Sequence, residues 1–176
     1  MNFKQQLAAE LSHKNMHFVA HCVGKNEAYF REIIELLLHD KDPVPARAAW
    51  VAEIVTIDFP YLIDPYLHDL IEALPRFTHP GSQRNTLKIL SRNCEKIEDE
   101  DDQGYLIDLC FTWIKDQDIT VAVKIFSMDI ITSFVKVYPE LAYELQSVIE
   151  DQFNKNSAGF KSRGRKTLKE IGRYIG

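Results

Sequence analysis

Helical periodicity runs through almost the whole 176-residue sequence and leaves no segment for a β-sheet. One example is the set Phe30, Ile33, Ile34, Leu37 and Leu38, which follows the i, i+3, i+4, i+7, i+8 spacing of a buried helix face. No segment shows sustained alternation of apolar and polar residues between hairpin turns. The periodicity therefore predicts an all-α fold.

Short polar or proline-containing breaks divide this periodic pattern into nine predicted helices. Their expected ranges are 3–22, 27–39, 45–58, 61–74, 82–96, 104–115, 120–137, 140–153 and 160–175. Because the connections are short, successive helices must lie antiparallel. We interpret the run of five acidic residues at 98–102 as a solvated loop before the sixth helix.

The length and composition predict one domain with a continuous core. Hydrophobic residues make up 45% of the chain, which is enough to exclude a disordered protein. We therefore expect a single domain that spans residues 1–176.

A sequence repeat is visible in the openings of alternate helices. Asp42-Pro43, His79-Pro80 and Gln117-Asp118 recur at spacings of 37 and 38 residues. A period of about 40 residues with two helices per unit is the value found in HEAT and armadillo repeats. The segment from Asp42 to Ala49 resembles the HEAT opening, in which Asp-Pro precedes a basic residue and a helix of small residues.

The HEAT resemblance implies both an architecture and a general role. It implies a right-handed α-solenoid of about four antiparallel helix pairs, closed by a C-terminal capping helix at residues 160–175. Such a stack forms because one helix pair cannot bury both of its apolar faces. Proteins of this kind bind a protein or peptide on the concave face of the stack, where we expect Tyr66, His68 and Asp69 to lie.

The chain also resembles short bacterial HEAT-like proteins that end in a basic Gly-Phe-x-x-Arg-Gly-x-Lys segment, here Gly159 to Lys166. Some of those proteins carry an adenylosuccinate lyase label, but this sequence lacks the Ser-Ser-x-Met-Pro-x-Lys loop of that lyase family. It also contains no nucleophile elbow, Walker loop or dinucleotide-binding glycine motif. We therefore expect a non-catalytic scaffold that uses no cofactor.

The clearest asymmetry of charge lies at the C-terminal end. From Lys155 onward seven Lys or Arg residues accompany one acid, giving +6, whereas the preceding residues carry −11. The candidate binding residues of the last helix are Lys161, Arg163, Arg165, Lys166, Lys169 and Arg173. Their counter-charge has three candidate sources: the acidic body of the chain, including residues 98–102, the phosphates of a nucleic acid, and an acidic protein partner.

The nucleic-acid alternative has a precedent in the HEAT-like alkyl-base DNA glycosylases. The resemblance to those enzymes is partial, because they have a strongly basic concave face and the body of this chain is acidic. A nucleic-acid-associated protein that contacts phosphates through its last helix is therefore our second hypothesis.

Three histidines in the first predicted helix suggest a third hypothesis, a metal-dependent hydrolase. His13, His17 and His21 are spaced at i, i+4, i+8, and an i, i+4 histidine pair can hold a transition metal. No carboxylate completes the set, so we expect a solvated stripe and no metal site. In the same helix we expect Leu11 and Phe18 on the buried face.

The cysteines and the apolar runs predict where the protein resides. Cys22, Cys94 and Cys110 are far apart and form no Cys-x-x-Cys, which is typical of a reducing compartment. No apolar run is long enough for a signal peptide or a membrane span. We therefore expect a cytoplasmic protein.

Overall fold

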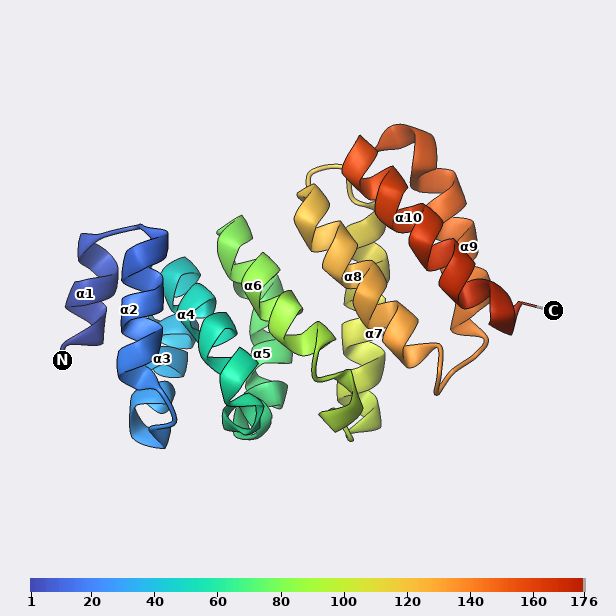
Figure 1. The fold of residues 1–176 in the computed structure, drawn as a ribbon. Coiled ribbons are helices and arrows are strands. Elements are labelled where there is room, and N and C mark those ends of the chain that lie inside the picture. The colour runs from blue at the N-terminus through green and yellow to red at the C-terminus, as the bar shows by residue number, and fades with distance from the viewer. Residues whose placement is uncertain (176) are drawn as a thin grey trace. The chain divides into compact units, whose positions relative to one another are not determined.

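The computed structural model describes residues 1–175, and every regular element in that part of the chain is a helix (Figure 1). The α-helices are α1 (Phe3–Ala9), α2 (His13–Val23), α3 (Glu27–His39), α4 (Val44–Asp58), α5 (Leu67–Ala73), α6 (Pro80–Ser91), α7 (Glu100–Lys115), α8 (Val121–Phe134), α9 (Leu141–Gln152) and α10 (Ala158–Ile171). Short 3₁₀ helices add η1 (Pro60–Tyr66), η2 (Leu74–Arg76), η3 (Cys94–Lys96), η4 (Phe153–Lys155) and η5 (Gly172–Tyr174). The predicted all-α arrangement of helix pairs is confirmed.

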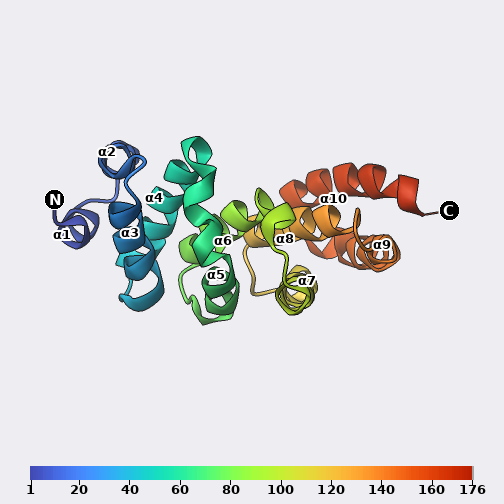
Figure 2. The same cartoon turned by 90° about the horizontal axis from the view of Figure 1, so that it is seen from below.

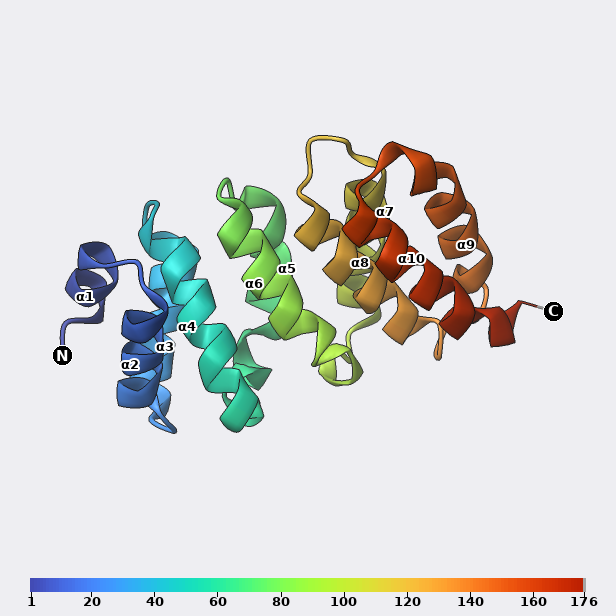
Figure 3. The same cartoon turned by 45° about the horizontal axis from the view of Figure 1, so that its top comes forward.

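The chain forms two compact units, Met1–Ile89 and Leu90–Gly176, whose boundary falls inside α6. In the first unit α2 lies beside α4 in one layer, and α3 and η1 form the layer behind them (Figure 2). In the second unit α8 lies beside α10, and α7 lies beside α9 in the other layer (Figure 3). The single-domain organisation and the right-handed sense of the stack stay predictions.

Side chains at the helix starts explain several boundaries. Asn26 caps α3 by accepting a hydrogen bond from the Tyr29 amide at 3.0 Å. Asp99 caps α7 by accepting hydrogen bonds from the amides of Asp101 and Asp102. The prediction that residues 98–102 form a loop was therefore wrong for most of that run. Acidic residues suit the first turn of α7 because the positive end of the helix dipole lies there.

The first predicted helix, 3–22, divides into α1 and α2. The backbone is extended at Glu10 and Ser12, and Ser12 caps α2. This break changes the register, so Leu11 is 62% exposed and Phe18 is 50% exposed, contrary to prediction. Met16, Val19, Ala20 and Val23 form the buried face of α2 instead.

The buried Asn15 side chain holds the two N-terminal helices together. Its Oδ1 accepts a hydrogen bond from Gln6 Nε2 at 2.7 Å, and its Nδ2 donates to the carbonyl oxygens of Gln6 and Glu10. The hydrogen bonds that the chain loses at the break are in part replaced by this side chain. The division of the first helix is thus a specified feature of the local sequence.

The fourth predicted helix, 61–74, also differs from the structure. Pro65 lies inside its first half, which adopts the 3₁₀ helix η1, and α-helical structure begins only at Leu67. Proline has no amide hydrogen to donate along an α-helix, so the α-helix starts after it.

Two glycines offer a test of helix packing in the second unit. A Cβ atom on Gly164 of α10 would lie 3.0 Å from Ile149 Cγ2 of α9, whereas a Cβ atom on Gly104 of α7 would meet nothing within 4 Å. We expect Gly164→Val to lower the free energy of unfolding by about 1–3 kcal/mol through overpacking. Gly104→Ala should raise it by about 0.5–1 kcal/mol, because alanine loses less backbone entropy in a helix.

Urea denaturation followed by far-ultraviolet circular dichroism measures both changes. Equal stability of Gly164→Val and the wild type would contradict the close approach of α9 and α10.

Candidate functional site

The basic helix α10 is fixed to the second unit along one face. Phe160, Gly164, Thr167 and Ile171 are buried, and α10 packs against α8 and α9 (Figure 3). Phe160 and Ile171 are fully buried, while Leu168 is half-buried. The opposite face therefore stays at the surface.

A buried lysine fixes the turn that leads into α10. Lys124 of α8 is only 1% exposed, and its Nζ donates a hydrogen bond to Asn156 Oδ1 at 2.8 Å. Burial lowers the pKa of this ammonium group. Asn156 Nδ2 in turn donates to the carbonyl oxygen of Gln152, which connects the end of α9 to the start of α10.

Arg163 is the member of the basic set that the protein itself neutralises. Its guanidinium group forms an ion pair and a hydrogen bond with the Asp129 carboxylate of α8. Burial raises the pKa of Asp129, and the neighbouring Arg163 opposes this rise. Asp129 is therefore the counter-charge of Arg163. Residues 98–102 do not supply the counter-charge of this arginine.

Two further arginines rest against aromatic rings. The guanidinium carbon of Arg165 lies 5.1 Å from the centroid of the Phe153 ring, and that of Arg173 lies 4.9 Å from the Tyr174 ring. These cation–π contacts orient the side chains without neutralising their charge.

The three lysines of the set remain unpaired. Lys166 and Lys169 are exposed and Lys161 is half-buried. Within residues 1–175 none of the three forms an ion pair. Lys166 nevertheless lies close enough to Asp129 for its positive charge to oppose the rise in the pKa of that carboxyl group. With Arg165 and Arg173 they form what we call the basic face of α10, a surface that attracts negatively charged groups.

The structure does not bring the three candidate histidines together as a metal site. His13 and His17 lie with their Nε2 atoms 3.1 Å apart, and all three side chains are exposed on α2, as predicted. Across the described part of the chain, no group of three or more His, Cys, Asp or Glu side chains is arranged to hold a metal ion. His21 therefore does not complete a ligand set with the other two.

The three residues that we expect on a binding face lie in η1 and α5. Tyr66 is half-buried, with its ring centroid 6.1 Å from that of Phe30. His68 lies 3.9 Å from Glu72 in an i, i+4 pair, and Asp69 is exposed. The three residues belong to the layer behind α4.

Sequence reasoning missed one cavity, which lies in the first unit. It has a volume of about 380 Å³ and is lined from Leu37 to Pro45 and from Ala73 to Ser82. The two segments are far apart in the sequence, and no motif spans them. The one available signal is the repeated Asp-Pro and His-Pro openings, which mark both segments as turns before a helix.

The geometry defines the class of the protein, a helical-repeat protein with a charged surface helix. A family model described as HEAT repeat domain matches residues 3–171. The chain therefore belongs to the HEAT repeat family. No curated protein matches the chain, and no solved structure matches it either.

Membership of this family bears on the general role. HEAT repeat domains are typically non-catalytic scaffolds that mediate protein interactions. Among the described residues, no helix is both long enough and apolar enough to cross a membrane.

The ion pair of Arg163 allows structural and surface charges of α10 to be separated. At about pH 7, Arg163→Ala should lower the free energy of unfolding by about 1–2 kcal/mol, because it leaves the partly buried Asp129 carboxylate without its partner. Lys166→Ala and Lys169→Ala should each change it by less than about 0.5 kcal/mol. Chemical denaturation of the three variants measures the difference.

The deficit in the free energy of unfolding of Arg163→Ala, relative to the wild type, should depend on pH in a defined direction. Burial already raises the pKa of Asp129, and removal of Arg163 raises it further. A carboxyl group whose pKa is higher in the folded than in the unfolded chain stabilises the fold as it takes up a proton. The deficit of Arg163→Ala should therefore shrink between about pH 7 and about pH 4. A deficit that grows as the pH falls would contradict this role.

Proposed function

We propose that the protein is a non-catalytic helical-repeat scaffold that binds an acidic protein or peptide segment on the basic face of α10. The observation that carries the proposal is a set of three lysines that form no ion pair within residues 1–175, Lys161, Lys166 and Lys169. Arg165 and Arg173, held by aromatic rings, extend the same positive surface. An unpaired cationic surface favours a partner that supplies carboxylates.

Rigid attachment of α10 supports a binding role. The buried residues Phe160 and Ile171 and the contact between Lys124 and Asn156 fix the helix, so its exposed side chains are presented with little loss of backbone entropy on binding. Family membership supports a protein partner, since HEAT repeat domains typically mediate protein interactions.

The nucleic-acid alternative rests on the same lysines. A nucleic acid long enough to pass beyond α10 would meet the rest of the chain, which carries a net charge of −11 before Lys155. A short acidic peptide that contacts α10 alone avoids this repulsion. The charge distribution therefore favours a peptide over a polynucleotide.

We also propose that the protein resides in a reducing compartment such as the cytoplasm. Cys22, Cys94 and Cys110 are free thiols in the fold. Burial raises the pKa of Cys94 to about 12 and raises that of Cys110 as well. Thiols held in the protonated form are poor nucleophiles, which supports a packing role for Cys94 and Cys110.

Anisotropy of a fluorescein-labelled decaglutamate peptide tests the basic face at low salt. We expect Lys161→Glu/Lys166→Glu/Lys169→Glu to weaken binding by tenfold or more, since each substitution replaces attraction with repulsion. The matched control is Lys14→Glu/Lys25→Glu/Lys115→Glu, which changes the net charge equally at three exposed lysines outside α10. The control should bind within about threefold of the wild type.

Labelled duplex DNA, single-stranded DNA and RNA form the second arm of the experiment. Tight, steeply salt-dependent binding of these probes by the wild type, lost in the α10 variant, would favour the nucleic-acid alternative instead. Equal losses in the α10 variant and its control would show that net charge alone governs binding, and the proposed face would be rejected.

A further inference from the structure

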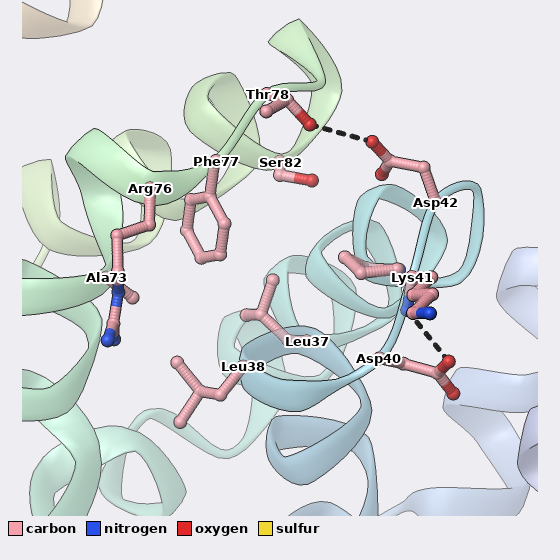
Figure 4. A pocket seen from close by; sticks show the side chains of 11 residues that line it. Leu37, Leu38, Asp40, Lys41, Asp42, Ala73, Arg76, Phe77, Thr78 and Ser82 are labelled. Carbon is pink, nitrogen blue, oxygen red and sulfur yellow. Dashed lines mark hydrogen bonds between the residues drawn. The ribbon is translucent and has the colours of Figure 1, made fainter.

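The cavity of the first unit combines an apolar wall with polar groups at its rim (Figure 4). It lies between the turn that joins α3 to α4 and the segment that joins η2 to α6. Leu37, Leu38 and Phe77 form its apolar wall, and the last two are only half-buried. A volume of about 380 Å³ accommodates a single side chain with its backbone, not a folded domain.

The two acidic residues of the rim are already engaged. Asp40 Oδ2 lies 2.8 Å from Lys4 Nζ, and Asp40 Oδ1 accepts a hydrogen bond from the Lys41 amide at 2.8 Å. These contacts hold the pKa of Asp40 below its usual value, the hydrogen bond from Lys4 most of all. Asp42 Oδ2 accepts a hydrogen bond from Thr78 Oγ1 at 3.0 Å.

The basic residues of the rim are not engaged. The side chains of Lys41 and Arg76 are exposed, and neither forms an ion pair within residues 1–175. Two acids and two bases line the cavity, and Lys4 neutralises one of the acids from outside. The local group therefore carries one positive charge in excess, on flexible side chains that can turn toward a bound anion.

Ser82 supplies the most specific signal. Its side chain is 1% exposed, and Oγ has no hydrogen-bond partner in the described part of the chain. Figure 4 shows this oxygen pointing into the space between Phe77 and Asp42. A buried hydroxyl without a partner is destabilising, so an acceptor that reaches it gains a favourable hydrogen bond.

The position of Ser82 in the chain also favours an anion. It lies in the first turn of α6, where the helix dipole is positive. Its own amide already donates to the His79 carbonyl oxygen, so the hydroxyl is the donor that remains for a ligand.

We propose that this cavity binds the C-terminal residue of a peptide whose last side chain is apolar. The α-carboxylate accepts a hydrogen bond from Ser82 Oγ and pairs with Arg76 and Lys41, while the side chain packs against Leu38 and Phe77. Because Ser82 Oγ is buried, the carboxylate reaches it only when the half-buried Phe77 ring turns aside. An α-carboxylate suits the cavity better than an aspartate or glutamate side chain, because its own Cα atom carries the apolar group.

This site is independent of the basic face of α10. It lies in the other unit and uses none of the residues of that face. The failure of one proposal therefore leaves the other untouched.

Two fluorescein-labelled peptides of sequence Gly-Gly-Ser-Gly-Gly-Leu test the proposal, one with a free C-terminal carboxylate and one with a C-terminal amide. The full-length protein should bind the free acid at least tenfold more tightly than the amide. Equal binding of the two peptides would overturn the proposal. The proposal would also be overturned if 4-methylpentanoate displaced the free-acid peptide and bound as tightly as the peptide does. That result would identify the ligand as a small free acid.

Variants of the protein identify the groups that act. Arg76→Glu should weaken binding of the free acid by about tenfold, and Ser82→Ala by about five- to tenfold. Arg84→Glu is the matched control, since Arg84 is also exposed on the neighbouring helix and does not line the cavity. It should bind within twofold of the wild type, and an equal loss in Arg76→Glu and Arg84→Glu would overturn the assignment.

Thermal unfolding of Ser82→Ala separates binding from folding. Because the hydroxyl has no internal partner, its removal should leave the Tm of the free protein unchanged or raise it. A fall of several degrees would show that Ser82 stabilises the free fold, which contradicts the proposed role. Amide chemical-shift changes at Leu38, Thr78 and Ser82 on addition of the free-acid peptide would locate the bound ligand.

Discussion

Each unit of the protein depends on one helix that is buried on nearly every side. In the first unit this helix is α4, which packs against α1, α2, α3 and η1, and in the second it is α8, which packs against α7, α9, α10 and η3. Small residues such as Ala48, Ala49 and Ala52 let the neighbours of α4 approach closely. A helix in this position must be covered on both faces, so the surrounding helices are held in two layers.

The two central helices each carry one buried charged residue that contacts a later element. Glu53 of α4 lies 2.9 Å from Lys88 of α6, and Lys124 of α8 donates to Asn156 before α10. A buried charge is costly unless it has a partner. These contacts therefore favour the one packing of the neighbouring elements in which each buried charge meets its partner. In the second unit, the arrangement that Lys124 supports presents the basic face of α10 at the surface.

Much of the fold could be predicted from the sequence because helical structure is encoded in local spacing. The i, i+3, i+4 pattern located α3, and the Asp42-Pro43 opening located α4. The predictions failed where a local side-chain interaction outweighs periodicity, as in the cap at Ser12 and the proline at position 65. The acidic run before α7 was misread for the same reason, since acids serve there as cap and first turn.

The sequence by itself determined the all-α class, the repeat family and the concentration of positive charge in the last helix. Only the tertiary structure decided which of those positive charges pair with a carboxylate of the protein itself. Arg163 and Asp129 are 34 residues apart, and the cavity that contains Ser82 joins segments about as distant. Periodicity and composition act over a few residues, whereas ion pairs and cavities depend on which surfaces the packed helices bring together.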